Sequence, residues 1–158
     1  MRRLIVFGYV EMGMDVLIVE DEVIIALDIQ NTLESAGHTV IGTALTIADA
    51  MAFIQAGRPD LALININLRE GRGAGIDLAR DLLKQYRVPS LFVSGQRSEA
   101  CRNRDAALGY LAKPWRTRAL LDSVEVARRL INGQDPAPLP PGLELFGWRQ
   151  PQQSGWNG

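Results

Sequence analysis

The chain has 158 residues, of which 47% are apolar and 22% are charged, and its net charge is -1. This length suits one globular domain with short terminal segments, and the near-neutral charge gives no broad attraction to nucleic acid or to a membrane surface. One cysteine, Cys101, excludes an internal disulfide framework and fits a reducing compartment. We therefore expect a cytoplasmic protein that binds neither nucleic acid nor membrane.

Five short apolar segments alternate with five helical patterns along most of the chain. The strands are expected at residues 15–19, 39–42, 61–66, 90–94 and 109–112. The helices are expected at residues 23–36, 47–55, 76–86, 98–108 and 117–131. Strands that are apolar on both faces, each followed by a helix, predict a parallel sheet with helices on both sides. The fold class is therefore α/β, a doubly wound five-stranded parallel sheet in three layers.

The two ends of the chain differ from this pattern. Residues 1–13 read as an N-terminal extension, and residues 14–132 as the globular domain. Residues 133–158 are rich in proline and glycine and show no helical or strand period, so a flexible tail is expected there. Trp148 and Trp156 are unusual in such a tail and suggest an alternative, in which it docks on the domain or on a partner.

Polar side chains follow four of the expected strands. Glu20 and Asp21 come directly after the first, Asn65 lies near the end of the third, and Ser94 ends the fourth. Lys113 follows the fifth strand and precedes a proline. Because sites in open parallel sheets form at the carboxyl ends of the strands, we expect these residues to meet at one edge.

These segments, in this order and spacing, resemble the receiver domain of two-component response regulators, which has a CheY-like or flavodoxin-like fold. The resemblance covers residues 16–131, nearly the whole globular part. The matching pieces are Val-Leu-Ile-Val-Glu-Asp-Glu at 16–22, Pro-Asp-Leu-Ala-Leu-Ile-Asn-Ile-Asn-Leu at 59–68, Phe-Val-Ser-Gly at 92–95 and Gly-Tyr-Leu-Ala-Lys-Pro at 109–114.

The resemblance implies a magnesium site next to a phosphoacceptor. It assigns Glu20 and Asp21 as the acidic pair that holds Mg²⁺, together with the backbone carbonyl of Asn67. Such a cation prefers oxygen ligands and offsets negative charge as the phosphoryl group arrives. The phosphoacceptor position falls on Asn65, where the family has an aspartate.

The resemblance also assigns the residues that respond to phosphorylation. Ser94 is expected to hydrogen-bond the phosphoryl oxygen, and Lys113 to pair with the acceptor and then with the phosphate. The bond between Lys113 and Pro114 is expected to be cis. Tyr110 is expected to act as an aromatic switch, although an ordinary core aromatic is the alternative. The surface formed by the fourth helix, fifth strand and fifth helix would bind the downstream protein.

Asn65 differs from the family's aspartate in the side-chain group that would attack phosphorus. An amide oxygen is a far weaker nucleophile than a carboxylate, and its product would be unstable, so we expect phosphorylation to be impaired. Mg²⁺ is expected to bind more weakly without being lost. Asp60 does not replace the acceptor, because five residues of strand place it about 16 Å away, at the wrong end of the sheet.

Three readings follow. In the first, the chain is a single-domain response regulator receiver in a phosphorelay, acting through protein contacts, and Asn65 is a laboratory change or a recent loss. Its partners would be a sensor histidine kinase or phosphotransfer protein and a downstream protein. In the second, it is a natural pseudo-receiver, a binding or dimerisation module independent of phosphorylation. The third, an enzyme or small-molecule binder that uses the acidic pocket, lacks a general base, so we expect no enzyme.

Overall fold

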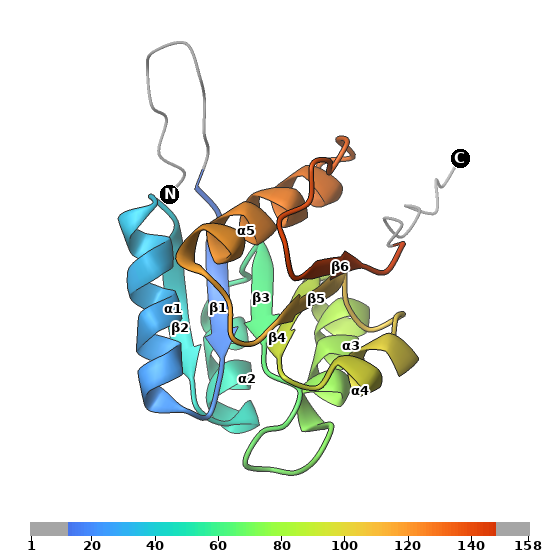
Figure 1. Ribbon diagram of the computed structural model, residues 1–158. Helices are drawn as coiled ribbons and strands as arrows, with labels where there is room; N and C mark the ends of the chain where they lie inside the picture. Colours follow the sequence, from blue (N-terminus) through green and yellow to red (C-terminus); the bar gives the residue numbers. More distant parts are fainter. Residues whose placement is uncertain (1–12, 148–158) are drawn as a thin grey trace, which may run out of the picture.

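The computed structural model describes residues 13–147 (Figure 1). The predicted N-terminal extension up to residue 12 lies outside the described residues, and so do Trp148 and Trp156. Among residues 13–147, no helix is both long and apolar enough to cross a membrane.

Strands and helices alternate along the chain from Asp15 to Ile131, and one further strand follows. In chain order the elements are β1 (Asp15–Val19), α1 (Val23–Ser35), β2 (Thr39–Ala44), α2 (Ile47–Ala56), β3 (Leu61–Ile64), α3 (Ala74–Tyr86), β4 (Ser90–Ser94), α4 (Arg97–Arg102), β5 (Gly109–Ala112), α5 (Thr117–Ile131) and β6 (Leu143–Leu145). The predicted α/β class with a central parallel sheet is confirmed.

The sheet has the strand order β2-β1-β3-β4-β5-β6, and its first five strands are parallel. Two apolar clusters cover its two faces. Side chains of α2, α3 and α4 pack on one face, and those of α1 and α5 pack on the other (Figure 1). The order reverses direction between β1 and β3, which is where an open parallel sheet forms a crevice at its carboxyl edge.

The prediction of a flexible tail from residue 133 onward is wrong in part. Residues 143–145 form β6, which pairs antiparallel with β5. The sheet therefore has six strands and not the expected five. A strand of three residues is too short to show an alternating pattern, and the prolines before it indicate a loop. Gly142 leads into it at φ 87°, a left-handed conformation that favours glycine.

The helix expected at residues 98–108 is also shorter than predicted. It ends at Arg102, because the Asn103 side chain donates a hydrogen bond to the backbone oxygen of Glu99 at 2.8 Å. Arg80 on α3 then binds the Asn103 side chain at 2.7 Å and the Asp105 carboxylate at 3.0 Å. These contacts hold the following residues as turns.

Replacing Gly75 with alanine is expected to destabilise the domain by about 1–3 kcal/mol, as overpacking does. The new Cβ would collide with the backbone oxygen of Asn65 and lie 2.9 Å from its carbonyl carbon. Urea unfolding measures this change. Gly57→Ala is the matched control, because a Cβ at position 57 meets nothing within 4 Å. Equal stability of the two variants would contradict the prediction.

Candidate functional site

Four strand ends place the predicted polar residues at one edge of the sheet. β1 is followed by Glu20 and Asp21, β3 by Asn65, and β5 by Lys113, while Ser94 is the last residue of β4. Glu20 and Ser94 are fully buried, and Asn65 is 9% exposed. The sheet thus brings polar side chains from four separate segments into one buried cluster.

The Asn65 side chain points its nitrogen at three oxygen atoms. Its Nδ2 donates to the backbone oxygen of Asn67 at 2.9 Å, and more weakly to Glu20 Oε1 at 3.4 Å and Asp21 Oδ1 at 3.5 Å. Because all three neighbours are acceptors, the amide must present its NH₂ group and not its oxygen. These are the three residues that the family resemblance assigned to Mg²⁺.

Glu20 and Lys113 form a largely buried ion pair. Lys113 Nζ lies 2.9 Å from Glu20 Oε2, with side-chain exposures of 17% and 2%. Burial raises the pKa of the Glu20 carboxyl above its ordinary value, although Lys113 and the backbone N–H of Glu22 oppose this shift. The direction of the shift indicates that the loss of hydration on burial outweighs the stabilisation of the carboxylate by its two partners. The lysine ammonium group therefore pairs with Glu20 in this structure.

A second asparagine shapes the loop beside the site. The side-chain oxygen of Asn67 accepts a hydrogen bond from the backbone N–H of Gly73 at 2.9 Å. Arg72 in the same loop pairs with Glu99 of α4 at 3.0 Å. Because the Asn67 side chain is held by the loop, its backbone oxygen stays turned toward Asn65.

Ser94 ends β4, and Tyr110 lies within the neighbouring strand β5. The Ser94 hydroxyl accepts a hydrogen bond from the Gln96 backbone at 3.2 Å, and the Lys113 backbone N–H donates to the Ser94 backbone oxygen at 3.0 Å. Tyr110 is 3% exposed, so its ring is turned inward, and burial raises the pKa of its hydroxyl. The bond between Lys113 and Pro114 is cis, as expected from the resemblance.

The oxygen atoms fit a hard divalent cation in kind but not in their present arrangement. Among residues 13–147, no three His, Cys, Asp or Glu side chains gather as a metal cluster. A cation at this edge would therefore depend on two carboxylates and the Asn67 carbonyl, with water completing its coordination. The Asn65 NH₂ group already uses these three oxygens, so the amide must turn away before a cation binds.

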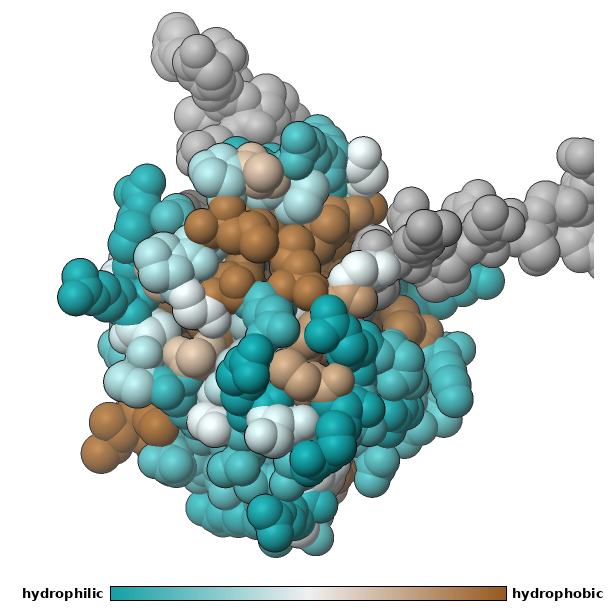
Figure 2. Space-filling view, turned by 45° about the vertical axis from the view of Figure 1, so that its right-hand side comes forward, coloured by the Kyte–Doolittle hydropathy of each residue, from teal (hydrophilic) through white to brown (hydrophobic). Residues whose placement is uncertain are grey.

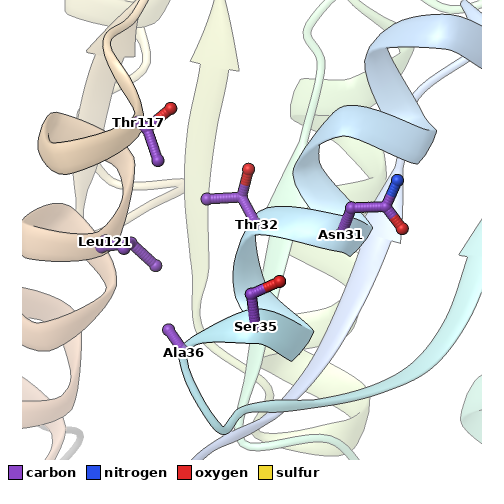
Figure 3. A pocket seen from close by; sticks show the side chains of 6 residues that line it. All are labelled: Asn31, Thr32, Ser35, Ala36, Thr117 and Leu121. Atoms are coloured by element: carbon purple, nitrogen blue, oxygen red, sulfur yellow. The ribbon is translucent and has the colours of Figure 1, made fainter.

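A separate hollow lies between α1 and α5 (Figure 3). Its lining residues are Asn31, Thr32, Ser35, Ala36, Thr117 and Leu121. None of them titrates near neutral pH, and the α1 residues come from the far end of that helix. At 1.5 Å per residue, Thr32 is about 13 Å along α1 from Val23, so the hollow is not part of the acidic cluster.

Comparison with known families then identifies the family of this fold. The sequence model described as the response regulator receiver domain matches residues 16–125, which is more than half of the chain. This chain belongs to the response regulator receiver family. The receiver resembles the phyllosphere-induced regulator PhyR of Methylorubrum extorquens, with 40% identity over 85 residues, covering 53% of this chain and 32% of PhyR.

Other relatives agree with this assignment. The transcriptional regulatory protein PdtaR of Mycobacterium tuberculosis is 31% identical over 115 residues, covering 71% of this chain and 55% of PdtaR. The receiver domain of NtrX from Brucella abortus superposes with a TM-score of 0.66 at 29% identity, covering 72% of this chain and 97% of that one. This chain thus spans about a third of the length of PhyR and about half of the length of PdtaR.

Sequence reasoning placed the principal site residues but missed what surrounds them. It gave no role to the Asn67 side chain, to Gly73 or to Arg72, which together order the loop. It also missed Gly75, whose lack of a side chain lets α3 approach the Asn65 backbone. The position of Asn67, two residues after Asn65 in the same extended segment, could have drawn attention to its side chain. Nothing in the sequence indicated the contacts that this side chain makes with the loop.

Proposed function

We propose that this receiver acts in a two-component phosphorelay through protein contacts, and that Asn65 stands at the phosphoacceptor position and impairs phosphorylation. The placement of Asn65 supports this. It follows β3 at the carboxyl edge, and its side chain meets both Glu20 and Asp21. We place the protein in the cytoplasm and assign it no enzymatic activity of its own.

The chemistry of the acceptor position carries this proposal. A carboxylate oxygen attacks phosphorus and forms an acyl phosphate, with Mg²⁺ offsetting charge on the phosphoryl oxygens. Asn65 has no such oxygen, and its NH₂ group takes up the neighbouring acceptors. Ser94 ends β4 and Lys113 follows β5 at the same edge, which supports the contacts with a phosphoryl group that we propose for them. The site therefore keeps its accessory groups and lacks its nucleophile.

An apolar surface beside the acidic edge supports a protein partner there. Val23, Ile24 and Leu27 of α1 are 48%, 83% and 49% exposed. They directly follow the acidic pair, at helical positions that share one side of α1. Exposed apolar groups next to a site are typical of a contact surface. We assign this surface to the sensor kinase or phosphotransfer protein.

A phosphorylation-independent binding module is the second candidate function, and one observation favours it. The Asn65 NH₂ group already gives Glu20, Asp21 and the Asn67 carbonyl a hydrogen-bond donor, so the cluster is satisfied without a cation or a phosphoryl group. In this reading the domain stays in one state, and its partners recognise that state directly.

The native chain is expected to gain no phosphoryl group from a small phosphodonor such as acetyl phosphate with Mg²⁺. The reason is that no carboxylate occupies the acceptor position. Intact mass spectrometry before and after incubation measures the gain. A labile phosphoryl adduct on the native chain, mapped to residues 61–68, would show that Asn65 does not block the chemistry.

A further inference from the structure

The β5 strand carries an added strand at its outer edge. β6 pairs with it through Gly109–Leu145, Tyr110–Glu144 and Leu111–Leu143. Two further hydrogen bonds extend the pairing, from Phe146 N–H to the Leu108 oxygen at 3.0 Å and from Ala112 N–H to the Gly142 oxygen at 3.1 Å. β6 thus lies on the face that includes α4, β5 and α5 (Figure 1).

Side chains on both sides of β6 enter the domain core. Leu143 and Phe146 are 9% and 8% exposed. Leu143 belongs to the cluster under α1 and α5, whereas Phe146 belongs to the cluster under α2, α3 and α4, together with Tyr110. The short strand is therefore anchored by one apolar side chain on each face of the sheet.

Two arginines bind the acidic residue between these anchors. Arg97 Nη2 lies 3.1 Å from Glu144 Oε2, and Arg104 Nη1 lies 3.8 Å from Glu144 Oε1. Arg104 also stacks over the Phe146 ring at 5.0 Å from its centroid. The edge of β5 thus places positive charge beside Glu144 and an apolar site beside Phe146.

The backbone of β5 is shaped for a close strand. A Cβ at Gly109 would collide with the Glu144 backbone oxygen and lie 3.2 Å from the Leu145 Cα. An apolar groove continues this edge toward the entry of β6, where Leu111, Trp115, Pro140 and Pro141 are among its lining residues. Figure 2, with this side of the molecule turned forward, shows an apolar area within a mostly polar surface.

We propose that the β5 edge is a docking surface for an extended peptide, and that residues 143–146 are its exchangeable resident occupant. The peptide it fits has the order apolar, acidic, apolar, aromatic. Main-chain pairing supplies affinity, and the arginines and the two apolar sites supply specificity. A partner protein with such a segment would displace β6. This surface is independent of the chemistry at Asn65.

Exchange requires that β6 opens without unfolding of the whole domain. In native-state hydrogen exchange of the full chain, the Phe146 and Ala112 amides are expected to exchange at least about tenfold faster than the Asn65 amide in the centre of the sheet. Glu144→Ala should speed them a further two- to fivefold or so, as loss of an exposed ion pair does. Glu125→Ala, which removes a similarly paired glutamate on α5, is the control and should leave them unchanged.

Peptide binding tests the surface directly. The probe is a fluorescent peptide with the sequence of residues 140–147, and the receiver is the full chain with Glu144→Ala and Phe146→Ala, which weaken the resident strand. This variant should bind the peptide at least about tenfold more tightly than the native chain does, because the resident strand no longer competes at high effective concentration. Adding Gly109→Ala should abolish binding.

Two results would overturn the proposal. One is exchange of the Phe146 and Ala112 amides at the same rate as the Asn65 amide, in both the native chain and Glu144→Ala. The other is a peptide affinity that is equal in the native and double-variant chains, or unaffected by Gly109→Ala. If the double variant does not fold, the peptide affinity of Glu144→Ala alone, which keeps both apolar anchors, is compared with that of the native chain, and equal affinities again overturn the proposal.

Discussion

Asn65→Asp is expected to give a receiver that takes a phosphoryl group from acetyl phosphate in the presence of Mg²⁺, while the native chain takes none. The substituted carboxylate would stand in the place of the amide, directly after β3. One of its oxygens would form the new bond to phosphorus while the acetate oxygen leaves with the bonding electrons. The expected yield changes from nil to a large fraction of the chains.

The rest of the site supports this gain. Lys113 is fixed at the same edge by its 2.9 Å contact with Glu20, and Ser94 is buried at the adjoining strand end. The Lys113 backbone N–H donates to the Ser94 backbone oxygen at 3.0 Å, so neither backbone position depends on the Asn65 side chain. In phosphoryl transfer, catalysis comes mainly from charged groups that are already positioned to stabilise the transition state.

Asn67→Asp is the matched control for this experiment. It adds the same negative charge two residues away, at a side chain that is turned to the loop and accepts from the Gly73 N–H. Intact mass and peptide mapping should find a labile adduct on Asn65→Asp and none on Asn67→Asp. Absence of the adduct from both would mean that the whole site has lost its chemistry, which favours the phosphorylation-independent module.

The sequence predicted the strand ends because their chemistry is local. Each of Glu20, Asn65, Ser94 and Lys113 ends or follows an apolar segment, and parallel strands bring such ends together without further information. The direction of the Asn65 amide was not predictable from the residue types. It depends on three acceptors, two directly after β1 and one in the loop after β3, and this loop is itself ordered by the contact between Asn67 and Gly73.

The short strand β6 near the C-terminus could not be predicted from local sequence. Leu143, Glu144 and Phe146 are too few to form a recognisable pattern, and the prolines before them favour a loop. Their order is given by tertiary contacts with β5 and with Arg97 and Arg104. Gly109 was a possible signal, because a glycine within a strand often marks the close approach of another backbone.

Mg²⁺ is expected to bind Asn65→Asp about 10- to 100-fold more tightly than the native chain, a range typical of changes beside metal ligands. In the native chain, the cation must displace an NH₂ group that holds the Asn67 carbonyl at 2.9 Å. In the variant, that donor becomes an acceptor carrying a negative charge, and the attraction between opposite charges is strong where water is excluded. Calorimetric titration with MgCl₂ at fixed ionic strength measures both affinities.

The same change should make the stability of the chain depend on Mg²⁺. Without Mg²⁺, Asn65→Asp loses three donated hydrogen bonds and adds a third carboxylate, so its free energy of unfolding should be about 1–3 kcal/mol below that of the native chain. Mg²⁺ well above its Kd for the variant should restore most of this loss there and change the native chain little, because a bound ligand stabilises the folded state by an amount that grows with the logarithm of its concentration divided by Kd. Urea unfolding of both chains, with Mg²⁺ and with a chelator, gives the four values. A native chain that Mg²⁺ stabilises as much as the variant would show that the amide turns away readily and that the metal site is intact.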